Sequence, residues 1–220
     1  MKIVKISDLI KKKVPETQLG YIQADVKYEK NSPELKKEIQ KIIEIKQNIP
    51  LEKIKEIPQI AYSRKAYKIF GKDPARYRLS AESLYRRIVK GKGLYFIDNV
   101  VDTINLASIY TGFSIGGYDY HKIQGEKIVF DIGRKDEEYF GIGRGKLNIE
   151  NLPVFRDALG AFGSPTSDSE RTKIDENTSK ILLLVVNFGT DRDFEKDLKQ
   201  IQTFIREFCS GKNFELLIFG

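Results

Sequence analysis

The stretch "DNVVDTINLASIYTGFSIGGYD", residues 98–119, joins a helical half to a glycine-rich turn. Apolar residues recur at helical spacing in the first half, so we expect a helix that buries one side. Gly112 and the pair Gly116-Gly117 then allow the chain to reverse closely. Because Asp102 and Asn105 interrupt the apolar pattern, they face either solvent or a pocket.

The sequence before this stretch predicts two strands and three helices. Alternating apolar residues predict strands at 2–5 and 19–28. Ser32 is a suitable N-cap for a helix that has proline at its first position. Further helices are expected at about 60–70 and from Ser80 onward.

The sequence after this stretch is richer in strands. Short apolar runs separated by glycine and charge predict hairpins at 121–149. The continuous apolar run "SKILLLVVNFG", 179–189, predicts a central strand that is buried on both faces. An amphipathic helix at 191–209 and a strand at 214–219 follow. The order of elements predicts an α+β fold, with layers of mixed sheet covered by helices.

Length and composition indicate a soluble globular protein with one domain, residues 1–220. No run approaches the roughly 20 apolar residues that a membrane crossing needs, and no signal peptide is recognisable at the start. With one cysteine, Cys209, and one histidine, His121, neither an internal disulfide nor a Cys/His zinc site is expected. We expect a cytoplasmic location, no membrane partner and no metal.

Positive charge is concentrated in the first half of the chain. Residues 1–110 hold 23 Lys/Arg against 13 Asp/Glu, a balance of +10, and residues 111–220 hold 15 against 18, a balance of −3. Such a surface attracts polyanions, whereas the alternative is an ordinary lysine-rich surface without a partner. If RNA binds, the candidate contacts are Arg86, Arg87, Lys90 and Lys92.

Two familiar patterns are incomplete. The segment "GIGRGK", 141–146, has three residues between Gly141 and Gly145 where a phosphate-binding P-loop has four, and no hydroxyl residue follows Lys146. It therefore predicts a flexible hairpin turn. A Ser/His/Asp triad lacks the G-x-S-x-G turn that would present its serine. No cofactor is expected.

The segment "GSPTSDSERTKIDENT", 163–178, gathers hydroxyl, carboxylate and guanidinium groups just before the most apolar strand. Loops that lead into a central strand commonly carry ligand-binding groups. A pocket with these groups would suit a small zwitterion or a sugar phosphate, whereas the alternative is a solvated connection.

Taken together, two blocks resemble the B3/B4 region of the phenylalanyl-tRNA synthetase β subunit. The first runs from "LSAESLYRRIVKGKGLYF" through Asp98-Asn99-Val100-Val101-Asp102-Thr103-Ile104-Asn105 to the turn at 112–119. The second, "SDSERTKIDENTSKILLL", is similar to stand-alone B3/B4 proteins. The resemblance covers about residues 60–190. Residues 1–59 and 190–220 would be additions that pack on this core.

The resemblance implies a layered α+β fold with an aminoacyl pocket between sheet and helices. In the synthetase this region hydrolyses tyrosine that is wrongly attached to the phenylalanine tRNA. Such a site positions the ester for attack by water, and it selects tyrosine by pairing the hydroxyl with polar groups. By the same resemblance, Asn105 would point into the pocket, and we expect Asp102 to pin a loop.

The sequence departs from the family pattern at three of four pocket positions. Ile104 stands where the family has threonine, Gly116 where it has histidine, and Leu184 where it has the glutamate that reads the hydroxyl. Selection of tyrosine by the synthetase's geometry is therefore not expected.

We expect a stand-alone relative of this editing region that binds tRNA, another RNA, or an aminoacyl or nucleotide-like ligand, without DNA specificity. The alternatives are an ester hydrolase that deacylates wrongly charged tRNA, and a protein-interaction module. The candidate ligand-binding residues, expected to converge on one hollow, are Asn105, Gly116, Gly117, Asp168, Ser169, Glu170, Arg171 and Thr172.

Overall fold

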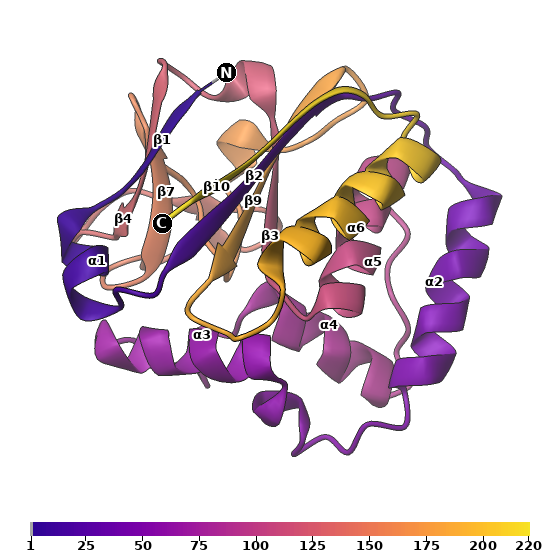
Figure 1. Ribbon diagram of the computed structural model, residues 1–220, viewed down its shortest axis with the longest axis horizontal. Coiled ribbons are helices and arrows are strands. Elements are labelled where there is room, and N and C mark those ends of the chain that lie inside the picture. The colour runs from indigo at the N-terminus through magenta and orange to yellow at the C-terminus, as the bar shows by residue number, and fades with distance from the viewer. Residues whose placement is uncertain (1) are drawn as a thin grey trace.

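The most apolar run of the sequence forms the central strand β9 (Lys180–Asn187). Its side chains alternate between two hydrophobic cores, because successive residues of a strand point to opposite faces. Leu183 and its neighbours at 181 and 185 face the helices, whereas Leu184 and its neighbours at 182 and 186 face a second sheet. In the computed structural model, which describes residues 2–220, β9 thus lies in the middle layer of three (Figure 1).

The middle layer is an antiparallel sheet with the order β10-β2-β9-β3. Its other strands are β2 (Gln18–Asp25), β3 (Ile115–Asp119) and β10 (Lys212–Phe219). Strand β3 is one edge of this sheet and pairs only with β9 among the described strands. The other side of β3 is therefore not paired with a described strand of this sheet and borders connecting segments.

The outer sheet has the order β1-β4-β7-β8 and is mixed, because β1 and β4 run parallel while the other pairs are antiparallel. Its strands are β1 (Ile3–Ile6), β4 (Lys127–Ile132), β7 (Pro153–Asp157) and β8 (Gly160–Gly163). The aromatic side chains of Tyr118, Phe130, Phe155 and Phe162 pack between the two sheets.

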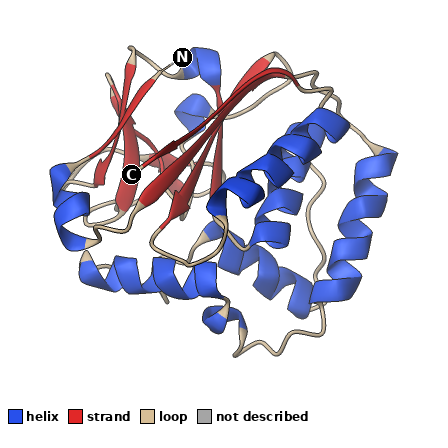
Figure 2. Cartoon of the chain, viewed as in Figure 1, coloured by secondary structure: helices blue, strands red, loops and turns tan. Residues whose placement is uncertain are grey.

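Helices cover the other face of the middle sheet (Figures 1 and 2). They are α2 (Pro33–Lys46), α4 (Ser80–Val89), α5 (Asn99–Thr111) and α6 (Phe194–Phe208). Helices α1 (Asp8–Lys13) and α3 (Pro58–Ile69) lie near the ends of the strands, and the remaining short turns are η1 (Ile54–Glu56), η2 (Tyr120–Lys122) and η3 (Glu170–Thr172).

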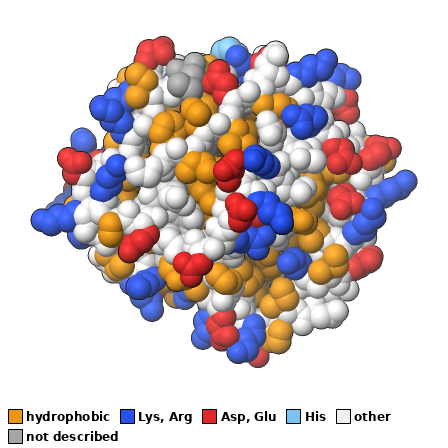
Figure 3. Space-filling view, viewed as in Figure 1, with side chains coloured by type: hydrophobic (Ala, Val, Ile, Leu, Met, Phe, Trp, Pro, Cys, Tyr) orange, Lys and Arg blue, Asp and Glu red, His pale blue; other side chains and the backbone are white. Residues whose placement is uncertain are grey.

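The predicted α+β fold, with mixed sheet layers and helices, is confirmed, although helices cover the middle sheet and not both sheets. Segment 141–146 forms a hairpin between β5 (Phe140–Gly141) and β6 (Gly145–Lys146), as predicted. Side chains of both charges are interspersed on the face shown in Figure 3, so the positive excess forms no separate patch there. Within residues 2–220, no helix is long and apolar enough to cross a membrane.

Candidate functional site

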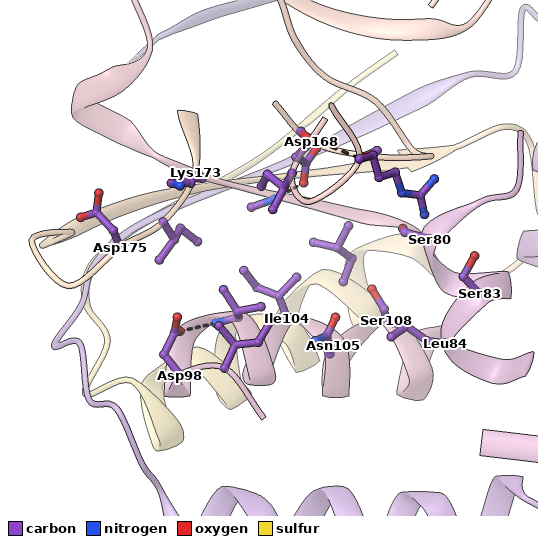
Figure 4. Close-up of a pocket in the computed structure, with 18 of the residues that line it drawn as sticks. Ser80, Ser83, Leu84, Asp98, Ile104, Asn105, Ser108, Asp168, Lys173 and Asp175 are labelled. Atoms are coloured by element: carbon purple, nitrogen blue, oxygen red, sulfur yellow. Dashed lines mark hydrogen bonds between the residues drawn. The ribbon is translucent and has the colours of Figure 1, made fainter. Parts of the chain in front are cut away.

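A cavity of about 700 Å³ lies between α5 and the segments that follow β8 (Figure 4). Helix α4 closes one end, and edge strand β3 contributes to the wall. The volume lies within the usual range for small-ligand sites. Its lining includes Tyr28, Ser80, Ser83, Leu84, Ile97, Asp98, Val101, Ile104, Asn105, Ser108, Ile115, Gly117, Ile142, Arg144, Ser164, Thr166, Ser167, Asp168, Lys173, Ile174, Asp175, Glu176 and Asn177.

Buried polar residues at the start of α5 fix this helix against the sheets. Asp98 is the N-cap, and its carboxylate accepts from the Val101 N–H at 2.8 Å. The Asn99 amide donates to the carbonyl oxygens of Lys27 and Phe208 and accepts from the Glu29 N–H. These bonds connect α5 to the segment after β2 and to the last residue of α6. The cavity-facing side of the helix is therefore held in place.

Asp102 lies on the buried side of α5 and does not line the cavity. Its Oδ1 accepts from the Ile97 N–H at 3.0 Å, so the expectation that Asp102 pins a loop is confirmed. Burial raises the pKa of this carboxyl to about 6. Asn105, one turn further on, lines the cavity (Figure 4).

The Asp168 carboxylate is the most constrained charged group in the cavity wall. Its Oδ1 accepts from the Tyr118 hydroxyl at 2.8 Å, and its Oδ2 accepts from the Gly117 N–H at 3.3 Å. Burial raises the pKa of Asp168 to about 7, although both hydrogen bonds favour the charged form. Asp168 therefore changes its protonation near neutral pH.

Three glycines make this arrangement possible. A Cβ on Gly116 or on Gly163 would lie 2.0 Å from the Tyr118 hydroxyl oxygen. A Cβ on Gly117 would lie 2.4 Å from Cδ1 of Ile104, which packs beneath the strand. Gly116 and Gly163 thus admit the hydroxyl that reaches Asp168, and Gly117 allows α5 to approach β3 closely.

The polar groups of the cavity fall into two sets. The first set is already bonded within the protein: the Ser164 hydroxyl donates to the Ser167 carbonyl, and the Thr166 hydroxyl is 2.9 Å from that of Tyr67. In the second set, the Asn105 amide and the Ser108 hydroxyl form no side-chain hydrogen bond within residues 2–220. Those two groups face the cavity from neighbouring turns of α5 and are available to a ligand.

The rim of the cavity carries charge of both signs. Arg144, in the turn between β5 and β6, is exposed, and the described part of the chain gives it no ion pair. Lys173 pairs with Glu170 at 2.8 Å, and Asp175 pairs with Lys122. Arg144 is therefore the rim cation that is free to meet an anionic ligand group.

The predicted convergence of Asn105 with Arg171 and Glu170 is wrong. Asn105, Gly117 and Asp168 line the cavity, but segment 169–172 turns away from it into η3 and borders a separate groove, except for the buried Thr172. The side chains of residues 169–172 instead form hydrogen bonds elsewhere in the protein.

Each of these four residues supports the chain locally. The Arg171 guanidinium forms two hydrogen bonds to the Asp157 carboxylate, at 2.8 and 2.9 Å. The Glu170 carboxylate accepts from the Gly143 N–H at 3.0 Å, which attaches the hairpin that carries Arg144. The Ser169 and Thr172 hydroxyls bond to the Arg171 N–H and the Phe162 carbonyl.

The prediction that Gly116 lines the ligand cavity is also wrong. Gly116 and Leu184 are paired neighbours on β3 and β9, and both face the core between the sheets. Because side chains alternate along a strand, Gly117 and not Gly116 borders the cavity. Neither family position, 116 or 184, is therefore part of this cavity wall.

The four predicted RNA-contacting residues lie at the end of α4 and after it. Arg86 forms an ion pair with the buried Glu82 at 2.9 Å, and the Arg87 guanidinium lies 3.9 Å from the Tyr95 ring centroid. Lys90 and Lys92 are exposed.

Sequence reasoning missed Ser80 and Ser83 of α4 and Arg144 of the hairpin as cavity residues. The spacing of the two serines at the start of a helix is a usable signal, because residues three apart share a face. Arg144 was harder to identify, because the sequence of a turn between two glycines does not determine the direction of its side chain. Across residues 2–220, no group of three or more His, Cys, Asp or Glu side chains could hold a metal ion.

Comparison with models of protein families matches the B3/4 domain over residues 62–203. The chain belongs to the B3/4 domain family. The match contains α4, α5, β3, segment 164–177 and most of α6, so every lining residue of the cavity except Tyr28 lies within the family region of the molecule. No curated protein matches the chain.

Proposed function

We propose that this B3/4 domain binds the aminoacyl end of a charged RNA in the cavity between α5 and segment 164–177. The main support for the proposal is that one largely apolar cavity is lined by two complementary groups. One is the Asp168 carboxylate, which hydrogen bonds hold in place, and the other is the Asn105 amide, which has no hydrogen-bond partner among the described side chains. An aminoacyl ester has matching groups: a protonated amine, an ester carbonyl and a side chain.

The chemistry of the three groups supports this match. An ammonium group forms strong, charge-assisted hydrogen bonds with a carboxylate such as that of Asp168. The Asn105 amide can donate to the ester carbonyl, and the rim cation Arg144 can pair with the phosphate next to the terminal ribose. The ligand would therefore be oriented by three separate contacts.

The amino-acid side chain would meet apolar groups. Leu84, Val101, Ile104, Ile115 and Ile174 line the cavity. We expect a preference for an aliphatic or aromatic side chain over a small or charged one. The preference is modest, since a methylene group changes binding in an apolar pocket by about 1–3 kcal/mol.

The test is calorimetric titration with 3′-deoxy-3′-(phenylalanylamido)adenosine, an amide that resembles the ester but resists hydrolysis. Asn105→Ala removes one donor, so we expect about tenfold weaker binding at an unchanged melting temperature. Asn48→Ala is the matched control, because Asn48 is exposed on the surface outside the cavity. No measurable binding by the unsubstituted protein, or equal affinity in both variants, would refute the proposal.

A second candidate is hydrolysis of the ester, favoured by the Asp168 carboxyl with its pKa of about 7. Such a carboxylate can accept a proton from water while the water oxygen attacks the ester carbonyl. The bond between the carbonyl carbon and the ribose oxygen then breaks, and the ribose oxygen takes up the proton. The measurement is release of the amino acid from charged tRNA, compared with its spontaneous loss. Equal rates with and without protein would eliminate this candidate.

A further inference from the structure

Two aromatic side chains stand exposed on the segment that connects α4 to α5. Tyr95 is 69% exposed and Phe96 is 48% exposed. Aromatic rings are costly to leave in water, because each adds a large apolar area. The two adjacent exposed rings are therefore a candidate contact surface for another molecule.

A cation lies over each of these rings. The Arg87 guanidinium is 3.9 Å from the Tyr95 ring centroid, and it is held there by hydrogen bonds to the carbonyl oxygens of Gly93 and Lys92. Lys36 of α2 places its Nζ 5.1 Å from the Phe96 ring centroid. The aromatic surface is therefore positively charged.

The same segment borders the cavity. It leaves α4, whose Ser83 and Leu84 line the cavity, and it ends at Ile97, which also lines the cavity. Figure 1 shows the segment running between α2 and α5. Because the Asp102 carboxylate accepts from the Ile97 N–H, the end of the segment is fixed to α5.

We propose that Tyr95 and Phe96 form a stacking surface for the unpaired nucleotides at the 3′ end of an RNA whose terminal residue enters the cavity. This inference rests on the proposed function and adds the partner's chemistry to it. Proteins bind single strands by stacking bases on aromatic side chains beside cations that follow the phosphates. Every base has a flat face, so the surface would tolerate different sequences.

The charge pattern favours a nucleic acid over a protein partner. A nucleic acid carries an anionic phosphate at every nucleotide, and each ring here has a cation beside it that could meet one. Three acidic residues that adjoin the segment already have partners for their carboxylates. Asp98 and Asp102 are buried and accept backbone N–H groups, and Glu29 is paired with Lys27.

The experiment is fluorescence anisotropy with a 5′-fluorescein-labelled single-stranded RNA of sequence ACCA. The double variant Tyr95→Ala/Phe96→Ala should bind at least about tenfold more weakly than the unsubstituted protein, since stacking contributes about 1–3 kcal/mol per base. Tyr95→Phe keeps the ring and should bind normally. The matched control is Leu159→Ala/Phe140→Ala, whose residues are 69% and 46% exposed and lie outside the proposed surface.

Salt dependence gives a second readout that structural damage would not reproduce. Lys36→Gln should reduce the slope of log affinity against log salt concentration by about 0.7, the value for one phosphate contact with a single strand. An unchanged slope in this variant would contradict the phosphate contact that the charged surface implies.

The proposal is overturned if the double variant binds the oligonucleotide as tightly as the control, or if a blunt RNA duplex binds as well as the single strand. The experiments distinguish failure of the stacking proposal from failure of the cavity proposal. If the stacking surface alone is wrong, the adenosine analogue still binds and still depends on Asn105. If the cavity proposal is wrong, the analogue fails to bind in every variant.

Discussion

Replacing Asp168 by Asn tests the electrostatics of the cavity directly. The change keeps the shape of the side chain: its carbonyl oxygen can accept from the Gly117 N–H, and its NH₂ can donate to the Tyr118 hydroxyl oxygen. It removes the carboxyl whose pKa burial raises from 3.8 to about 7. The two proteins should therefore differ in how their stability depends on pH.

The sign follows from proton binding. Between the unfolded pKa of 3.8 and the folded pKa of about 7, the folded protein holds a proton on Asp168 that the unfolded chain has lost. The contribution of Asp168 to stability is therefore largest below the lower value and falls as the pH rises through this window. Roughly three pKa units at 1.36 kcal/mol each give a loss of about 4 kcal/mol.

The assay is urea unfolding of both proteins at several values from about pH 4.5 to about pH 8.5. The difference in unfolding free energy should shift in favour of Asp168→Asn as the pH rises and become constant above about pH 8. Contributions from Asp98 and Asp102, which also titrate with raised pKa values, are common to both proteins and cancel. A difference that is constant across this range, or that shifts in the opposite direction, would refute the assignment of a buried, proton-binding Asp168.

Three other predictions concern stability and reactivity. Gly163→Ala should lower the unfolding free energy by about 1–3 kcal/mol in a urea titration, because the new Cβ would meet the Tyr118 hydroxyl at 2.0 Å; an unchanged midpoint would contradict the close packing. Asn99→Ala should lower the unfolding free energy by about 3 kcal/mol, since three hydrogen bonds of the buried Asn99 side chain are lost, and normal stability would show that they are dispensable. Burial raises the pKa of the Cys209 thiol to about 12, so a thiol reagent at neutral pH should modify it only after unfolding in guanidinium chloride. Rapid modification of the folded protein would show that the thiol is accessible.

Elements with strong local signals were predictable from the sequence. Ser32 caps α2, as predicted, and the apolar run at 179–189 contains the central strand. Periodicity and capping are local properties, and each follows from residues that are close in the chain. The hairpin at 140–146 was predictable for the same reason.

The cavity wall was only partly predictable, because its composition depends on which way side chains turn. Gly116 and Gly117 are adjacent, yet only Gly117 borders the cavity, since the stacking of two sheets decides which face of β3 is covered. Similarly, Asp168 faces the cavity while Arg171 turns outward to Asp157 through η3. The partner Asp157 lies at the end of β7 in the outer sheet, and nothing near position 171 in the sequence reveals it.

The central claim is that the cavity between α5 and segment 164–177 receives an aminoacyl group. A crystal structure of the protein with 3′-deoxy-3′-(phenylalanylamido)adenosine tests it most directly. The account predicts the ligand's ammonium group within hydrogen-bond distance of the Asp168 carboxylate and its carbonyl facing the Asn105 amide. Density for the ligand in the groove beside Arg171, with the cavity empty, would contradict it.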